Sequence, residues 1–246
     1  MIASRATYPS LAGRRVFITG GATGIGAEMV RAFAGQGARV SFIDLDAAAG
    51  AALAAATATD FARIDVTDVA ALQAAITAAG RIDVLVNNVA NDTRHDPLKV
   101  TETDWRRTMA VNLDAAFFAA QAVIPAMQAN GGGAIINFSS INALLGPADM
   151  PGYVTAKAGL LGLTKALARQ YGGTRIRVNT ILPGWVVTER QLAHWLTPEA
   201  EAEWAKSTAL PDRILPSDVA SLALFLAADD SAMITGQQFI IDAGRV

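Results

Sequence analysis

The 246-residue sequence contains no cysteine and only two histidines, His95 and His194. Without cysteine the chain can form no disulfide, no thiolate nucleophile and no cysteine-ligated metal site, a composition that fits the reducing cytoplasm. Two histidines also disfavour a multi-histidine metal centre. We therefore expect a cytoplasmic protein whose site holds no metal.

Basic clusters and long apolar runs are also missing. The net charge is −2, and no stretch of Lys and Arg marks a nucleic-acid surface. No segment approaches the roughly 18 unbroken apolar residues of a membrane span, and residues 1–11 lack the apolar core of a signal peptide. We expect neither nucleic acid nor a membrane as a partner.

Short apolar runs alternate with helical patterns along the whole chain. Strands are expected over residues 15–19, 39–44, 61–64, 84–86, 134–138, 177–182 and 238–242. The helices between them include a long one over 104–128, kinked by Pro125, and one that begins with Ser217 as its N-cap. This order predicts an α/β fold with a doubly wound parallel sheet of about seven strands, covered by helices on both faces. No linker or repeat divides it, so one domain over 1–246 is expected.

Three glycines lie between the first strand and the helix that follows it. Gly20, Gly24 and Gly26 leave room for a pyrophosphate to meet backbone N–H groups at the helix N-terminus. Glycine clusters alone are weak evidence, because any tight turn favours them. The strand–turn–helix context makes dinucleotide binding the favoured interpretation.

Tyr153 and Lys157 lie four residues apart, on one face of a predicted helix. A phenol has a pKa near 10, and an ammonium beside it favours the phenolate, which gives a base that works near neutrality. Ser140, after an apolar run, could hold the oxygen that the tyrosine deprotonates. On this spacing alone an ordinary tyrosine and lysine are the more frequent explanation, so the rest of the chain must decide.

Taken together, the motifs resemble the short-chain dehydrogenase/reductase family over nearly the whole chain. The resemblance rests on Thr19-Gly20-x-x-x-Gly24-Ile25-Gly26, Asn87-Asn88, Val111-Asn112-Leu113, Ser140 thirteen residues before Tyr153, Tyr153-x-x-x-Lys157, Pro183-Gly184 with Thr188, and Ile234-Thr235-Gly236-Gln237. Two departures stand out. Val89-Ala90 replaces the usual Ala-Gly, which adds a β-carbon near the cofactor ribose, and Asp242-Ala243-Gly244 replaces Asp-Gly-Gly.

The resemblance implies a Rossmann-type fold, a nicotinamide cofactor and a catalytic set of Asn112, Ser140, Tyr153 and Lys157. In the family's pattern Tyr153 is the acid/base, Ser140 orients the substrate oxygen, and Lys157 supports the tyrosine and bonds the nicotinamide ribose. Asn112 bulges its helix and holds a water of the proton relay. The implied cofactor-binding residues are Gly20, Thr23, Gly24, Ile25, Gly26, Asp44, Leu45, Asp65, Val66, Asn88, Ala90, Tyr153, Lys157, Pro183, Gly184, Val186 and Thr188.

The choice between NAD and NADP can be argued from charge. Asp44 ends the second strand, where a carboxylate accepts hydrogen bonds from ribose hydroxyls and repels a 2′-phosphate. Neither the glycine turn nor Leu45-Asp46 offers a basic residue for that phosphate, so NAD is expected. Asp65 matches the family's adenine contact, although a turn residue before a helix is an equally good explanation.

The substrate must be read from the loops. Asn91-Asp92-Thr93-Arg94-His95 is a polar run, and residues 185–213 form an expected flexible lid with three tryptophans. Aromatic faces with hydrogen-bonding side chains suit a sugar, although a solvated loop and a merely packed lid explain the composition as well. Tyr8-Pro9-Ser10-Leu11, Asn91-Asp92-x-Arg94-His95, Arg190-Gln191…Trp195-x-Thr197-Pro198-Glu199 and Ile241-Asp242-Ala243-Gly244 resemble the bacterial D-xylose, L-arabinose and galactose 1-dehydrogenases.

On this resemblance the enzyme oxidises an aldose at C1 with NAD, giving the aldonolactone. The expected substrate contacts are Asn91, Ser140, Asn142, Tyr153, Trp185, Gln191 and Trp195. Two alternatives stay open: an NAD(P)-dependent enzyme of another alcohol or ketone, such as a polyol or a 3-oxoacyl thioester, and a cofactor-binding scaffold or sensor without catalysis. The family also implies a homotetramer.

Overall fold

The computed structural model describes residues 6–194 and 197–246 of the chain. Its centre is a seven-stranded parallel sheet in the order β3-β2-β1-β4-β5-β6-β7. The strands are β1 (Arg15–Thr19), β2 (Arg39–Asp44), β3 (Asp60–Arg63), β4 (Val84–Asn87), β5 (Gly133–Phe138), β6 (Ile176–Pro183) and β7 (Gln238–Ile241). The strand order reverses between β1 and β4, which is the switch point of a doubly wound sheet. The predicted fold class is confirmed.

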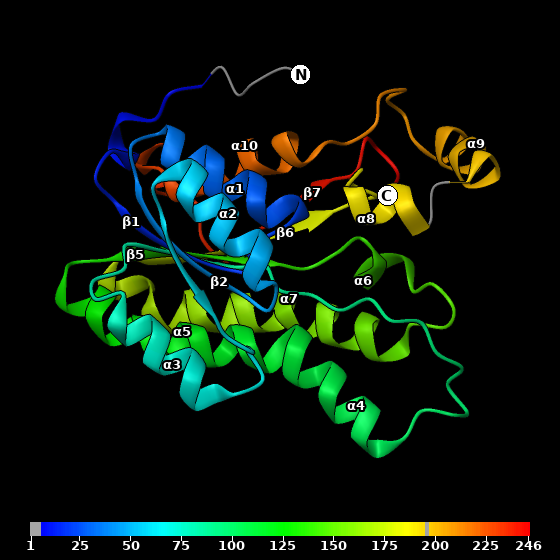
Figure 1. Ribbon diagram of the computed structural model, residues 1–246, viewed down its shortest axis with the longest axis horizontal. Coiled ribbons are helices and arrows are strands. Elements are labelled where there is room, and N and C mark those ends of the chain that lie inside the picture. The colour runs from blue at the N-terminus through cyan, green and yellow to red at the C-terminus, as the bar shows by residue number, and fades with distance from the viewer. Residues whose placement is uncertain (1–5, 195–196) are drawn as a thin grey trace.

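Helices cover both faces of the sheet (Figure 1). One face carries α1 (Gly24–Gly35), α2 (Ala47–Thr57) and α10 (Pro216–Ala227), and the other carries α3 (Val69–Ala78), α5 (Ala115–Ala129) and α7 (Pro151–Tyr171). Each layer has its own apolar core, with Phe33 and Leu224 in the first and Leu85 and Met127 in the second. Because strands such as β4 are buried on both sides, they read as unbroken apolar runs.

The long helix predicted over 104–128 is divided in the structure. It consists of α4 (Glu102–Met109), a π-helical turn (Ala110–Asp114) and α5. The interruption lies at the π turn, and Pro125 is accommodated inside α5. Residues 102–129 together are the one stretch among the described residues long and apolar enough to cross a membrane by length and composition, yet α5 buries Ala119, Val123 and Met127 against the sheet.

The prediction of Ser217 as an N-cap is wrong. α10 begins one residue earlier, at Pro216, and the backbone N–H of Leu215 donates to the carboxylate of Asp218 at 2.7 Å. Proline is favoured at a first helical position because its missing N–H would have no partner there. The remaining helices are α6 (Asn142–Leu145), α8 (Glu189–His194) and α9 (Pro198–Ser207). Short 3₁₀ turns lie at Pro9–Leu11, Gly172–Thr174 and Asp229–Ser231.

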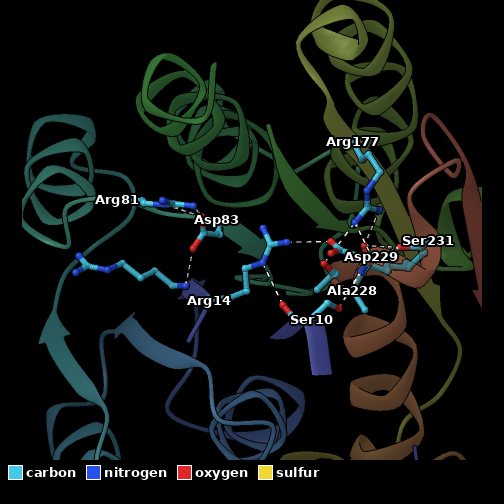
Figure 2. Close-up of polar contacts among 11 residues, drawn as sticks. Ser10, Arg14, Arg81, Asp83, Arg177, Ala228, Asp229 and Ser231 are labelled. Atoms are coloured by element: carbon cyan, nitrogen blue, oxygen red, sulfur yellow. Dashed lines mark hydrogen bonds and ion pairs between the residues drawn. The ribbon is translucent and has the colours of Figure 1, made fainter. Parts of the chain in front are cut away.

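A network of hydrogen bonds and ion pairs connects neighbouring segments at the end of the sheet where the strands begin (Figure 2). Arg14 pairs with Asp229 at 2.9 Å and donates to the backbone oxygen of Ser10, while the Asp229 backbone N–H donates to the Ser10 hydroxyl. Arg177, at the start of β6, donates to the Leu226 carbonyl at 2.7 Å, in the last turn of α10. These bonds tie the N-terminal segment, β6 and α10 together and leave the opposite end of the sheet for binding.

Candidate active site

A cavity of about 1160 Å³ opens at the carboxyl ends of the strands, where open α/β sheets bind their ligands. It extends from Asp44, at the end of β2, to Trp204 in α9. Most of the predicted site residues line it: Gly20, Thr23, Ile25, Gly26, Asp44, Leu45, Asp65, Val66, Asn88, Ala90, Asn91, Ser140, Asn142, Tyr153, Pro183, Gly184, Trp185, Val186, Thr188 and Gln191. Residues that are distant in sequence therefore share one site.

The glycine turn fits a pyrophosphate. Gly20 and Gly24 have φ angles of +68° and +54°, which favour glycine, and a β-carbon on Gly24 would lie 3.3 Å from Thr188. The side chain of the N-cap residue Thr23 makes no capping hydrogen bond. The first N–H groups of α1 have no acceptor within the helix, so they can bind an anion. Gly24 itself is not a lining residue; it shapes the turn beside Thr188.

The end of β2 presents a fixed carboxylate. Asp44 accepts hydrogen bonds from the backbone N–H groups of Ala22 at 3.0 Å and Asp46 at 3.1 Å. Arg63, which the sequence argument did not consider, is the register partner of Asp44 on β3 and donates to the Leu45 carbonyl at 3.2 Å. A basic side chain therefore lies close to the carboxylate that was expected to select the cofactor.

Asp65 forms a turn before α3. Its Oδ1 accepts from the Thr67 backbone N–H at 2.9 Å and from the Thr67 hydroxyl at 2.7 Å, and these bonds lower the pKa of the Asp65 carboxyl. The structure thus supports the turn role that the sequence left open, and it places the carboxylate on the cavity wall beside Val66. The exposed side chain of Leu45 lines the same part of the cavity.

Tyr153 and Lys157 occupy successive turns of α7, and both side chains are buried. The ammonium nitrogen of Lys157 lies 5.7 Å from the centroid of the Tyr153 ring and donates to the Phe138 carbonyl at 2.7 Å. Burial lowers the pKa of Lys157 to about 7. The hydroxyl of Ser139 donates to the Lys157 carbonyl at 2.7 Å, so this serine joins the end of β5 to the helix.

Ser140 and Asn112 complete the predicted set from two other elements. Ser140 lines the cavity, and its Oγ accepts from the Asn142 backbone N–H at 3.2 Å. Asn112 is buried in the π turn, and its side chain bonds the backbone N–H and carbonyl of Asn91 at 2.9 and 3.0 Å and the Thr108 carbonyl at 3.0 Å. The Asn112 side chain thus uses its oxygen and nitrogen to hold the Asn91 loop. The predicted relay water would therefore have to bind to the main chain of Asn112.

The predicted substrate contacts lie at the other end of the cavity. The indole N–H of Trp185 donates to the Gln191 side-chain oxygen at 2.7 Å, so these two residues orient each other. The Asn91 side-chain oxygen accepts from the Thr93 backbone N–H and hydroxyl, at 3.0 and 2.6 Å. Trp195 lies outside the described residues. Two predicted residues, Asn112 and Lys157, are buried behind the cavity wall.

The sequence analysis did not name several further lining residues as parts of the site, among them Arg107, Met150, Trp204 and Arg245. Arg245 follows β7, and the rule that ligands gather at the carboxyl ends of strands would have pointed to it. Arg107 and Trp204 lie on helices whose orientation the sequence did not give. Within residues 6–194 and 197–246, no group of acidic or histidine side chains could hold a metal ion.

Comparisons with known proteins agree with this geometry. Residues 20–245 match the family model described as enoyl-(acyl carrier protein) reductase. The chain is 47% identical to a D-xylose 1-dehydrogenase of Caulobacter vibrioides over 98% of this chain and 99% of that protein. It is 48% identical to a probable galactose dehydrogenase of Rhizobium meliloti over 96% of each.

Among solved structures, a putative gluconate dehydrogenase from Agrobacterium tumefaciens matches with a TM-score of 0.93 at 27% identity, over 98% of each chain. The sequence motifs, the site geometry and these matches lead to one conclusion: the chain belongs to the short-chain dehydrogenase/reductase family, whose members are oxidoreductases.

Proposed function

We propose that the protein oxidises an aldose at C1 with NAD, giving the aldonolactone, and that Tyr153 is the base. The observation that carries this proposal is the shared cavity. Ser140 and Tyr153 lie on the wall of one cavity that joins the glycine turn and Asp44 to Trp185 and Gln191. The names of the relatives, a D-xylose 1-dehydrogenase and a probable galactose dehydrogenase, favour an aldose as the substrate.

The proposed reaction assigns one task to each residue. The Ser140 hydroxyl, whose oxygen already accepts from the Asn142 backbone N–H, donates a hydrogen bond to the substrate oxygen and orients it. A positive Lys157 favours the phenolate form of Tyr153, and this phenolate takes the proton of the anomeric hydroxyl and becomes the neutral phenol. When bound, the nicotinamide cofactor would accept the hydride that leaves C1. The lactone leaves the site and hydrolyses to the aldonic acid.

The proton that Tyr153 takes from the substrate would reach solvent through a relay that includes Lys157. The π turn around Asn112 opens a helical hydrogen bond, so a main-chain carbonyl there can hold a water beside the lysine. Asn112 keeps the turn in place through its bonds to Asn91 and Thr108. In this proposal Asn112 acts as a positioning residue for the relay.

NAD is the proposed cofactor because the Asp44 carboxylate can accept from ribose hydroxyls and opposes a 2′-phosphate. Gly24 would contribute by shaping the turn, and Lys157 by a hydrogen bond to the nicotinamide ribose. Asp65 would contact the adenine. Ala90 and Val89 both line the cavity, and Val89 also packs against the second core, so this departure places two side chains at the cofactor site, where we expect binding to persist. A cytoplasmic location fits the cysteine-free sequence.

We also propose a homotetramer. Trp105 and Phe117, on α4 and α5, are large apolar side chains with more than a third of their surface exposed, and β7 is an edge strand that carries the exposed Ile240. Exposed apolar side chains on an extended helical face, and unpaired strand edges, favour association with further copies of a chain.

A reductase of another carbonyl is the main rival function. The matching family model is described by an acyl-carrier-protein substrate, and one relative, 34% identical, is a 3-oxoacyl-[acyl-carrier-protein] reductase. Initial rates with NAD and NADP across aldoses, polyols, secondary alcohols and a 3-oxoacyl thioester separate the two functions. Turnover of an apolar alcohol or thioester without turnover of any aldose would reject the sugar proposal.

The catalytic proposal is tested with Tyr153→Phe and the control Tyr171→Phe, near the end of the same helix. Removal of the Tyr153 hydroxyl should reduce kcat by about 10³-fold or more, since general acid–base catalysis contributes about 10²–10⁴-fold. The control should retain the wild-type rate. Trapping the product with hydroxylamine identifies the lactone. Unchanged turnover in Tyr153→Phe would leave the scaffold or sensor alternative.

A further inference from the structure

The segment after β7, residues 243–246, forms a tail that brings one side chain, Arg245, to the cavity wall. β7 ends at Ile241, and Arg245 lines the cavity four residues later. The Arg245 side chain is partly buried, and among the described residues it makes no hydrogen bond or ion pair. A guanidinium on a cavity wall without a protein partner retains its five N–H donors for a ligand.

A buried carboxylate holds the tail in this position. Asp242 is 5% exposed, and its two oxygens accept from the backbone N–H groups of Gly244 at 2.9 Å and Val246 at 2.8 Å. Burying a carboxylate is costly unless it is hydrogen-bonded, and here both bonds fix the backbone on either side of Arg245.

Two further contacts attach the tail to the lid. The Ala243 carbonyl accepts from the backbone N–H groups of Ala209 at 2.9 Å and Leu210 at 3.0 Å, just after α9. Ala243 itself has a φ of +60°, a left-handed conformation that is unfavourable for alanine. The fold thus maintains a strained residue and a buried carboxylate to fix one short segment, which indicates a role for the residue that the segment presents.

The tail lies at the end of the cavity away from the expected adenosine contacts. The Gly184 backbone N–H donates to the Ile241 carbonyl at 2.8 Å, and a β-carbon on Gly184 would approach Asp242 to 2.8 Å. The segment that leaves Gly184 carries the expected substrate contacts Trp185 and Gln191 as well as expected cofactor contacts such as Thr188. Of the expected adenosine contacts, Asp44 ends β2 and Asp65 follows β3, at the far side of the sheet.

We propose that Arg245 is a substrate-binding residue that donates hydrogen bonds to hydroxyl groups of the sugar away from C1. The inference rests on the proposed aldose substrate. The planar guanidinium fork can donate two parallel N–H bonds, which suits neighbouring hydroxyls on a ring. Arg245 would therefore help to determine which aldoses bind.

The test uses the full chain with Arg245→Met, which keeps an unbranched side-chain stem and all the backbone bonds of the tail. The KM for the best aldose should rise about tenfold or more, the equivalent of about 1.4 kcal/mol, and the KM for NAD should stay within about twofold. Arg245→Lys should restore part of the affinity, because it retains a cation but not the fork. Arg169→Met, on the exposed side of α7, serves as the matched control.

Monodeoxy analogues of the sugar separate direct contact from a structural effect. In the wild type, the analogue that lacks the bonded hydroxyl should bind more weakly than the parent sugar, and this difference should vanish in Arg245→Met. An unchanged sugar KM, a larger effect on the KM for NAD, or a deoxy penalty that persists in the variant would overturn the inference. A wild type that turns over no aldose removes the proposed function as well, so the two failures are distinguishable.

Discussion

The burial of Lys157, a residue proposed to act in catalysis, lowers the stability of the folded protein. Its side chain is fully buried, its nitrogen has one carbonyl partner in Phe138, and burial lowers its pKa to about 7. A lysine free in the unfolded chain has a pKa near 10.4. The charged form is thus disfavoured in the folded enzyme until an anion such as the Tyr153 phenolate forms beside it. Lysine and tyrosine then act as a coupled pair.

This burial predicts a pH dependence of stability. Between about pH 7 and pH 10 the unfolded chain binds the Lys157 proton and the folded chain does not, so stability rises with pH, by at most about 1.4 kcal/mol per unit. Below pH 7 both states are protonated and the contribution is constant. Urea unfolding of the cofactor-free enzyme and of Lys157→Met across pH 6–10 checks this. The Met variant should lose the rise, and parallel profiles would contradict the burial argument.

Arg63 changes the prediction for cofactor choice. Because it lies beside Asp44 in the sheet register, replacement of the carboxylate should leave a cation near the ribose. We predict that Asp44→Ser raises kcat/KM for NADP about ten- to a hundredfold, or about 1.4–3 kcal/mol, by removing a like charge. Adding Arg63→Met should cancel most of the gain.

Asp46→Ser is the matched control for this change. Asp46 caps α2 through the Ala49 N–H, serine can provide the same cap, and the side chain does not line the cavity. NADP use should stay at the wild-type level. If Asp44→Ser gained no NADP activity, the carboxylate would not be what excludes the phosphate.

At the scale of elements, local patterns predicted most of the fold. Seven strands and their order along the chain followed from apolar runs and turn residues, because a parallel sheet buries its strands on both faces. The patterns could not give the π turn at 110–114, since its residues suit an ordinary helix; the family resemblance supplied the bulge at Asn112. They also missed α6, a four-residue helix too short to show a period.

The site divides in the same way. The glycine turn and the Tyr153 pair follow from short-range spacing, whereas Arg63 and Arg245 reach their positions through strand register and a C-terminal tail. Such contacts between distant segments are set by the tertiary fold; the place of Arg245 after a strand gives only a general signal, and the sequence near Arg63 does not reveal its register with Asp44.

Arg177 caps α10 across the sheet, and its loss should destabilise that helix. Its guanidinium donates to the carbonyls of Leu226, Ala227 and Ala228 at 2.7–3.4 Å, where a helix end leaves acceptors without partners. Arg177→Met should reduce the free energy of unfolding by about 2 kcal/mol, since hydrogen bonds to charged groups contribute about 1.5–3 kcal/mol.

Urea midpoints at one fixed protomer concentration measure this effect, with Arg39→Met as the control. Arg39 is an exposed arginine at the start of β2 whose side chain makes no hydrogen bond among the described residues, so its loss should change stability by less than about 0.5 kcal/mol. Equal urea midpoints for the two variants would show that the Arg177 cap of α10 adds nothing to the free energy of unfolding. Activity should persist, because Arg177 lies at the end of the sheet opposite the cavity.

The whole molecule places its chemistry and its exposed apolar surface on different parts of the fold. The cavity occupies the carboxyl ends of the strands, while Phe117 lies on α5 at one face of the sheet and Ile240 on the edge strand β7. Two separate apolar regions allow two separate contacts between copies, and two different two-fold contacts generate a closed tetramer.

The assembly prediction follows from this separation. Wild-type protein should scatter light as four protomers of 25.6 kDa each. Phe117→Glu should disrupt the helical contact and Ile240→Glu the strand-edge contact, because each buries a charge in an apolar interface. Each single variant should form dimers and the double variant monomers. Leu98→Glu, in a loop where the side chain is 95% exposed, is the control and should remain tetrameric. A wild type that is already monomeric would refute the assembly, and dissociation by only one of the two variants would assign the tetramer to other surfaces.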